Sequence, residues 1–186
     1  MGSTGFVIES SAGAGGNFTI WRLVDGEPKE VDLTEDERAA YTPPPEGKYD
    51  LKIVGIASTW KEPKKPEWIK RDDAGNIVGK DYTLMTALEF EILSGRGKGK
   101  RFSSRIPCSI YDTSHLGKVW KACGFSISPG ASYEIPLMLG KQVSLFVEKN
   151  AGIDRNGNPV NYANPTWSTA KPVGSADTAD DGWPDE

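Results

Sequence analysis

The sequence predicts a mainly β domain in which one helix lies between the third and the fourth of five strands. Three observations lead to this class. Short segments alternate between apolar and polar residues with a period of two, glycine and proline are frequent at 21 and 13 of 186 residues, and one central segment repeats apolar residues at helical spacing. A chain of this length holds one well-cored domain with appendages, or at most two small domains.

Three strands are expected between residues 47 and 106. The segments GKYDLKIVGIA, YTLMTALEFEIL and RFSSRI each alternate so that one face of the strand is apolar. The residues predicted on the buried face are Tyr49, Leu51, Ile53, Tyr82, Leu84, Thr86, Leu88, Phe90, Ile92, Phe102 and Ile106. The residues predicted on the opposite, outward face of the second and third strands are Thr83, Met85, Ala87, Glu89, Glu91, Arg101, Ser103 and Arg105.

The helix is predicted over residues 113–124, where Thr113 can cap the first turn and Gly124 can end the last. Its apolar face comprises Leu116, Val119, Trp120 and Cys123. The segment KQVSLFVEK then predicts a fourth strand, and the turn at Asn156-Gly157 predicts a hairpin into a fifth. This order of strands and helix fits a five-stranded Greek-key barrel of the OB-fold type.

Residues 1–43 are predicted to form an N-terminal arm. A turn at Asp25-Gly26 allows a small hairpin, and the spacing of Thr34 and Glu37 is that of a capping box at the start of one short helix. The prolines that follow end the helix, because proline cannot continue it.

The remainder of the chain divides into a domain and a tail. Residues 44–170 are predicted to be the OB-fold domain, and residues 171–186 a disordered acidic tail, which is too polar and too charged to bury enough surface. Within the domain, the connector over residues 61–81 predicts a protruding loop or a small hairpin.

Charge is distributed unevenly along the chain. Residues 44–125 hold 15 basic and 10 acidic side chains, a net charge of +5, whereas residues 1–43 and residues 175–186 each have a net charge of −5. A basic middle favours an anionic partner. No apolar run approaches the about 20 residues that cross a bilayer, no signal-peptide pattern is present, and the two cysteines do not form a metal-binding pair. We therefore expect a soluble, reduced, cytoplasmic protein.

The residue types that most enzymes need are missing. The chain has one histidine and two cysteines, which are too few to complete a zinc site, a Cys-His dyad or a Ser-His-Asp triad in the expected arrangement. The turn GRGKGK lacks the spacing and the hydroxyl residue of a phosphate-binding loop of the Walker type. Glu89 and Glu91 share a strand face as a metal pair would, yet without an evident third ligand they are predicted to be solvated edge charges. We expect no catalytic activity, no metal and no cofactor.

The basic middle interleaves tryptophans with lysines and arginines. Proteins that bind single strands combine cations, which meet phosphates, with flat side chains on which bases stack. One cluster brackets Trp60 and Trp68 in the connector that flanks the binding face of OB-folds, and a second lies in the glycine-rich turn and along the third strand. Both tryptophans could equally pack against the barrel, and Tyr162 is a further stacking candidate. The predicted nucleic-acid-binding residues are Trp60, Lys61, Lys64, Lys65, Trp68, Lys70, Arg71, Arg96, Lys98, Lys100, Arg101, Arg105 and Tyr111.

The succession PPPEGKYDLKI, LEFEILSGRGKGKRF, LGKVWKACGF and LGKQVSLFVEKNAGIDRNGNPVN resembles small phage-encoded OB-fold proteins that bind single-stranded DNA or belong to phage recombination operons. The resemblance covers residues 43–167. Its motifs are Pro45 and Gly47, the turn from Gly95 to Lys100, Leu116-Gly117, and the segment from Leu137 to Lys141. It implies non-sequence-specific binding of single-stranded DNA in phage replication or recombination, in the cytoplasm of an infected bacterium.

The end of the chain, DTADDGWPDE, resembles the acidic C-terminal tails of bacterial and T7-like phage single-stranded-DNA-binding proteins, which recruit replication partners. Those tails end on an aromatic residue or on Pro-Phe, whereas here two acidic residues follow Trp183-Pro184. The resemblance implies a docking tail, and its charge predicts competition with DNA for the basic groove. The predicted partner-binding residues are Asp180, Asp181, Trp183, Asp185 and Glu186.

Two other functions are compatible with the sequence. The barrel could be a protein-interaction or virion module that does not bind DNA. A nuclease or other metal enzyme is a weaker alternative, because its ligands are missing. An oligomer is compatible with each of these functions.

Overall fold

The computed structural model describes residues 18–174 except residues 42, 62–64, 81–82 and 154–155. Its elements are β1 (Phe18–Val24), β2 (Glu27–Leu33), α1 (Glu35–Ala39), β3 (Gly47–Lys61), η1 (Pro66–Trp68), β4 (Ile69–Arg71), β5 (Ile77–Lys80), β6 (Thr83–Ile92), β7 (Arg101–Pro107), α2 (His115–Ala122), η2 (Ile135–Met138), β8 (Gln142–Ile153) and β9 (Pro159–Pro172). The protein is mainly β, as predicted. None of the helices in this part of the chain is long and apolar enough to span a membrane.

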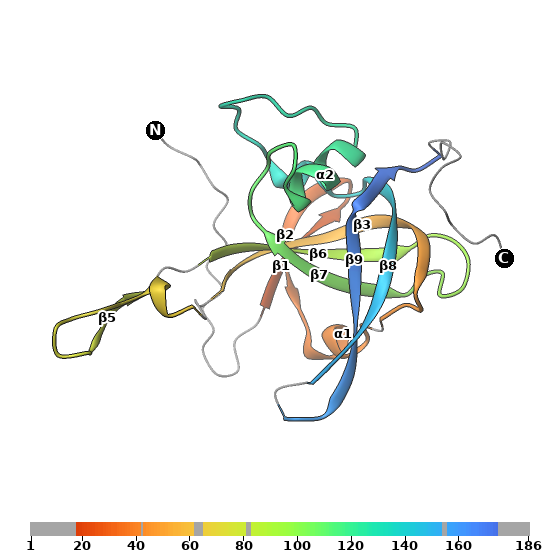
Figure 1. Ribbon diagram of the computed structural model, residues 1–186. Coiled ribbons are helices and arrows are strands. Elements are labelled where there is room, and N and C mark those ends of the chain that lie inside the picture. Colours follow the sequence, from red (N-terminus) through yellow and green to blue (C-terminus); the bar gives the residue numbers. More distant parts are fainter. Residues whose placement is uncertain (1–17, 42, 62–64, 81–82, 154–155, 175–186) are drawn as a thin grey trace.

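Seven antiparallel strands form the main sheet (Figure 1). β3 is its central strand. The first residues of β3 pair with β8, the residues from Leu51 onward pair with β6, and Ile56 pairs with Trp21 of β1. β6 continues to β7, β8 continues to β9, and β1 forms a hairpin with β2. α2 follows β7 and precedes β8, which is the predicted position of the helix.

The predicted closed barrel of five strands is not observed. The described residues of β7 and β9, the two strands expected to close it, do not pair with each other. β7 ends at Pro107, which has no backbone N–H to donate to a further strand. β9 shifts its register with β8 between Ser144 and Phe146, and there the Phe146 amide donates to the Thr169 side chain at 2.9 Å. The β1–β2 hairpin brings the sheet from five strands to seven.

The apolar face predicted from alternation is confirmed in β3, β6 and β7. Every predicted inward residue that the structure describes is buried except Leu84, which is half-buried, and Tyr82 lies outside the described residues. Met85 was predicted to point outward but is buried, so this prediction is wrong. Phe90 lies between two further aromatic rings of the core, with centroids 5.4 Å away for Phe102 and 6.3 Å away for Trp167. These contacts join β6 to both β7 and β9.

α2 packs its predicted apolar face into the same core, and Trp120 packs against Phe125 with the two rings tilted and their centroids 4.4 Å apart. The N-cap is Ser114 and not the predicted Thr113. The Ser114 hydroxyl accepts a hydrogen bond from the Gly117 amide at 3.0 Å, which is the N-cap to N3 geometry. Cys123 is half-buried at the end of the helix, and burial raises the pKa of its thiol to about 12.

The N-terminal arm contains the predicted hairpin and short helix. The Glu37 amide donates to the Thr34 hydroxyl at 3.2 Å and the Thr34 amide donates to the Glu37 carboxylate at 3.0 Å, so the capping box is present. The hairpin approaches β3 closely at Gly55, where a Cβ would lie 2.5 Å from Cδ1 of Ile20. The arm is therefore part of the main sheet.

Candidate nucleic-acid interface

The connector between β3 and β6 is a small hairpin, β4–β5, that stands away from the main sheet (Figure 1). Asp72 organises its turn, because its carboxylate accepts hydrogen bonds from the amides of Ala74 and Asn76 at 3.0 and 2.8 Å. Arg71 closes the same turn by donating to the Gly75 carbonyl at 2.7 Å. The prediction of a small hairpin here is confirmed.

This hairpin presents a tryptophan together with cations. The side chain of Trp68 is 40% exposed, and the ammonium nitrogen of Lys65 lies 4.9 Å from the centre of its ring. Such a cation–π contact holds the charge next to a flat surface. Lys70 and Arg71 are exposed on β4. A stacking surface and three positive charges thus lie within one short segment.

Three other residues of this predicted cluster, Trp60, Lys61 and Lys64, are only partly covered by the structure. Trp60 and Lys61 end β3, and the Trp60 backbone pairs with Leu84 of β6. Their side chains, and Lys64 as a whole, lie outside the described residues.

The second basic cluster begins in the turn that joins β6 to β7. Gly95, Gly97 and Gly99 have φ values of 73°, 93° and 81°, which side-chain-bearing residues rarely adopt. The Gly99 amide donates to the Ile92 carbonyl at 2.8 Å and closes the turn. The cations of this turn are all exposed to solvent and are Arg96, Lys98 and Lys100.

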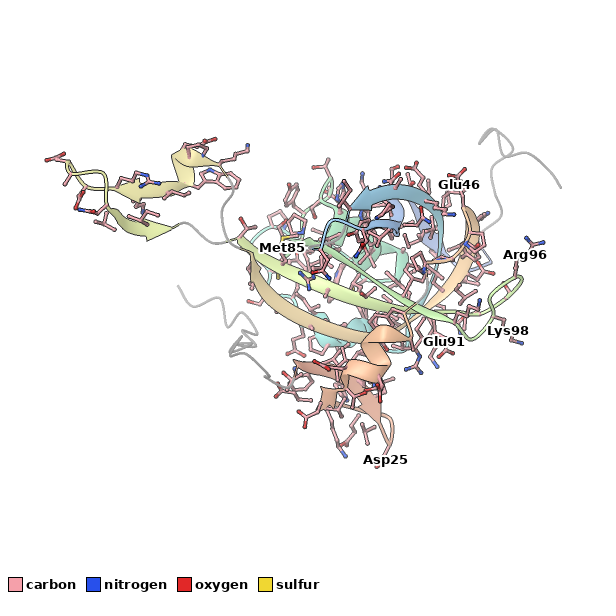
Figure 2. The ribbon with its side chains drawn as sticks, turned by 90° about the horizontal axis from the view of Figure 1, so that it is seen from below. Asp25, Glu46, Met85, Glu91, Arg96 and Lys98 are labelled. Atoms are coloured by element: carbon pink, nitrogen blue, oxygen red, sulfur yellow. The ribbon has the colours of Figure 1, made fainter. Side chains whose placement is uncertain are left out.

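The two clusters lie at opposite ends of the molecule. β6 runs from one to the other with 10 residues, and at about 3.3 Å per residue this length corresponds to roughly 30 Å. In Figure 2, Met85 marks the end of β6 near the β4–β5 hairpin, while Arg96 and Lys98 lie at the far end. The structure does not bring these two clusters into a single groove.

The two arginines of β7 differ in their surroundings. Arg101 donates to the Glu91 carboxylate from Nε and one terminal nitrogen at 3.2 and 3.1 Å, and its other terminal nitrogen lies 3.5 Å from Glu89. Its charge is thus already balanced by carboxylates. Arg105 is exposed opposite Ala87 of β6. Of these two predicted phosphate contacts, Arg105 is the more available.

Glu89 was predicted to be a solvated edge charge, and this prediction is wrong. Its side chain is 1% exposed. Two nitrogens contact its carboxylate from different elements, Arg22 of β1 at 3.0 Å and Arg101 of β7 at 3.5 Å, and the Tyr41 hydroxyl donates to it as well. Burial first, and then the hydrogen bond to Glu89, raise the pKa of Tyr41 above its usual value.

Arg22 also forms an ion pair with a second carboxylate, that of Glu37 in the N-terminal arm. Its other terminal nitrogen lies 2.8 Å from Glu37, and this hydrogen bond, together with that from the Thr34 amide, lowers the pKa of Glu37 to about 2. Burial opposes the charge of Arg22, but its hydrogen bonds to Glu37 and Glu89 raise its pKa. These contacts fasten the N-terminal arm over the outward face of β6, and sequence reasoning did not foresee them.

Two of the aromatic candidates are exposed tyrosines. Tyr111 lies just before α2, and Tyr162 lies on β9 near the tip of the β8–β9 hairpin. The Tyr162 ring covers Gly152, where a Cβ would lie 2.5 Å from it, and its hydroxyl donates to the Ile153 carbonyl at 3.4 Å. Ile153 is itself exposed beside this ring. Ile153 was not predicted to be a binding residue, although an isoleucine three residues before the Asn156-Gly157 turn indicates an apolar side chain near the hairpin tip.

Glu89 and Glu91 are both bound by arginine, and among the residues that the structure describes no three His, Cys, Asp or Glu side chains are grouped to hold a metal ion. The predicted partner-binding residues Asp180, Asp181, Trp183, Asp185 and Glu186 lie outside the described residues. A comparison with known protein families and a search of curated proteins find no match for this chain.

Proposed function

We propose that this protein binds single-stranded DNA without sequence specificity. The observation that carries the proposal is the β4–β5 hairpin, which presents the exposed ring of Trp68 next to Lys65, Lys70 and Arg71. Bases of any sequence can stack on such a ring, and the neighbouring cations can meet the phosphates on either side of the stacked base.

The order of the strands supports the same function. The order β7-β6-β3-β8-β9, with α2 between β7 and β8 in the chain, is compatible with the proposed OB-fold, although the last pairing of a closed barrel is missing among the described residues. OB-folds bind strands across their second and third strands, between the loop after strand one and the loop after strand four. Under the proposed OB-fold, these parts would correspond to β6 and β7, the β4–β5 hairpin and the β8–β9 hairpin.

The β4–β5 hairpin, β7 and the β8–β9 hairpin together suggest a path for the single-stranded DNA. It would stack on Trp68, cross β7 at Arg105, and meet Tyr162 and Ile153 on the β8–β9 hairpin. The outward side of β6 near Glu89 is covered by the N-terminal arm and is not part of this path. The turn with Arg96 is a second, separate basic surface that a longer strand would reach.

A role in phage replication or recombination, and a tail that recruits partner proteins, are part of the proposal. Both rest on the resemblance in sequence and on the five acidic and no basic side chains of residues 175–186.

A titration of fluorescent oligo-dT tests the central proposal. Binding should be saturable, should survive an excess of duplex competitor, and should weaken steeply with salt as counterions are released. Trp68→Ala should cost about 1–3 kcal/mol and leave the salt dependence unchanged. Lys29→Ala on β2 is the control for a generic change of surface. Absence of binding at low salt, or equal competition by duplex, would contradict the proposal.

A second function has an observation of its own. The same hairpin exposes Ile77 and Val78, and Val78 is 65% exposed. Apolar side chains at this place suit a protein partner better than phosphates. A protein-interaction or virion module is therefore the alternative, and the double variant Ile77→Ser, Val78→Ser separates the two. If Trp68→Ala abolishes oligo-dT binding and the double variant does not, the result favours DNA binding. If the double variant abolishes a protein complex and Trp68→Ala does not, the result favours the protein-interaction module.

A further inference from the structure

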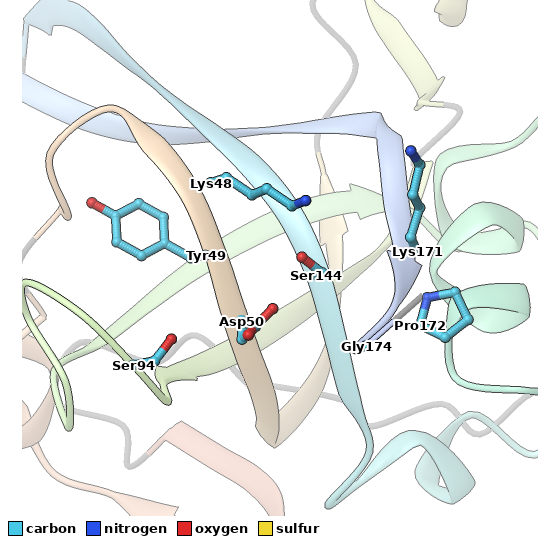
Figure 3. A pocket seen from close by; sticks show the side chains of 8 residues that line it. All are labelled: Lys48, Tyr49, Asp50, Ser94, Ser144, Lys171, Pro172 and Gly174. Atoms are coloured by element: carbon cyan, nitrogen blue, oxygen red, sulfur yellow. The ribbon is translucent and has the colours of Figure 1, made fainter. Parts of the chain in front are cut away.

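A pocket of about 310 Å³ opens between β3, β8 and β9 (Figure 3). Three of its residues face one another across neighbouring strands: Asp50 of β3 pairs with Ser144 of β8, and Ser144 pairs with Lys171 of β9. Side chains in such positions have Cβ atoms about 4.5–5.5 Å apart. Lys48 lies on the same face of β3, two residues before Asp50. The register of the sheet thus assembles two ammonium groups, a hydroxyl and a carboxylate.

Ser144 is the unusual member of this group. It is 6% exposed, and its hydroxyl oxygen is buried without a hydrogen-bond partner in the described part of the chain. A buried hydroxyl normally has a partner, because leaving it unpaired costs free energy. Its place in the pocket wall makes a bound ligand the natural partner.

The charges around Ser144 indicate which ligand this is. Figure 3 shows the ammonium groups of Lys48 and Lys171 on one side of Ser144 and the Asp50 carboxylate on the other. Ser94, at the start of the basic turn, supplies a second hydroxyl. Burial raises the pKa of Tyr49, another residue of the pocket wall, and the positive charge of Arg96 opposes this rise. Cations with hydroxyl donors suit an oxyanion with several acceptor oxygens.

We propose that this pocket binds a phosphate group, which accepts hydrogen bonds from Ser144 and from the ammonium groups of Lys48 and Lys171. The phosphate can come from the backbone of a nucleic-acid strand or from a free phosphate. The first source rests on the proposed function, and the second does not. Asp50 repels the anion and keeps the site weak and exchangeable, which suits a strand that must leave again.

The test uses the full chain in phosphate-free buffer at constant ionic strength. Backbone amide NMR shifts are followed while inorganic phosphate replaces chloride. We expect saturable shifts at Lys48, Ser144 and Lys171. Ser144→Ala should weaken phosphate binding about tenfold, because it removes one hydrogen bond to a charged group. Lys171→Gln should weaken it as well, and Asp50→Asn should tighten it. Lys29→Gln, which removes the same charge from an exposed site on β2, should leave it unchanged.

A second arm identifies the source by measuring oligo-dT affinity in the same variants. If Ser144→Ala and Lys171→Gln weaken both ligands, the pocket holds a strand phosphate. If they weaken inorganic phosphate alone, the pocket holds a free phosphate. Both results support a phosphate site. Phosphate shifts that map elsewhere, or that persist in Ser144→Ala and Lys171→Gln with the affinity of the parent, overturn it. Failure of oligo-dT to bind any variant, with phosphate binding intact, contradicts the proposed function alone.

Discussion

Arg22 of β1 and Glu89 of β6 form an ion pair 3.0 Å long, although they are 67 positions apart in the sequence. Glu89 is buried, so the groups that contact its carboxylate offset the cost of removing it from water. Arg22 comes from the N-terminal arm and Arg101 from the neighbouring strand. The pair therefore fixes the arm to the sheet and also decides which face of β6 stays open to a ligand.

Arg22→Met should lower the free energy of unfolding by about 3 kcal/mol, because it leaves a buried carboxylate with fewer partners. Urea denaturation followed by tryptophan fluorescence measures the change. Lys29→Met is the matched control, since Lys29 is the cross-strand neighbour of Arg22 and is exposed. Its effect should stay within about 0.5 kcal/mol. Equal losses in the two variants would show that the ion pair is not what holds the arm.

Acid should weaken the same contact through Glu37. Its pKa falls from 4.5 to about 2 on folding, mainly through the hydrogen bond from Arg22. A lowered pKa stabilises the folded state above the unfolded value, and this contribution disappears as the pH falls from 4.5 to about 2. Because Glu37 is partly exposed, salt should reduce the effect. Glu37→Gln should lose less stability than the parent across this window in low salt, as measured by urea midpoints. If the stability of Glu37→Gln and of the parent fell in parallel with pH, the Glu37 carboxylate would not contribute to the acid sensitivity.

The sequence predicted which strand faces are apolar but not what covers the opposite faces. Period-two alternation was enough for Phe90 and Phe102, because burial of one face is a local property of a strand. Glu89 was misjudged because its partner Arg22 comes from a segment that the sequence pattern treats as separate. The separation of the two basic clusters follows from connectivity, since successive turns of a meander lie at opposite ends of the strand between them. Ser144 could not have been singled out, because its importance depends on its register with Asp50 and Lys171.

Arg105 and Arg101 should contribute differently to DNA binding. Arg105 is exposed, whereas Arg101 is held by Glu91 and Glu89. Arg105→Gln should weaken oligo-dT binding and flatten the slope of log affinity against log salt by about 1. Arg101→Gln should leave that slope unchanged, and thus serves as the matched variant on the same strand. The reverse result would mean that DNA displaces the carboxylates from Arg101.

Ser144→Ala should not destabilise the unliganded protein. The buried hydroxyl has no partner within the described residues, so its removal relieves a desolvation cost of about 1 kcal/mol. In phosphate-free buffer the variant should unfold at the same or a higher urea concentration than the parent. Ser168→Ala, an exposed position on β9, is the control. Added phosphate should stabilise the parent and not the variant, since a ligand stabilises the state that binds it. A loss above about 1 kcal/mol without phosphate would indicate that the hydroxyl supports the fold itself.

Deletion of residues 175–186 should tighten binding of oligo-dT at low salt. The segment holds five acidic and no basic side chains, and it begins directly after Gly174, which lines the pocket together with Lys48 and Lys171. The acidic segment is therefore joined covalently to the wall of the proposed phosphate pocket, and its effective concentration near Lys48 and Lys171 is high. Replacement of the acidic residues from 175 onward by their amides should tighten binding like the deletion, because charge and not length causes the competition. If the tail recruits a partner protein as proposed, Trp183→Ala should leave DNA affinity unchanged but abolish capture of that partner, because the substitution removes the proposed apolar anchor. The gains in DNA affinity expected from the deletion and from the amide replacement should both vanish at high salt, because screening removes the competition. Weaker DNA binding by the truncated chain would mean that the tail assists the strand instead of competing with it.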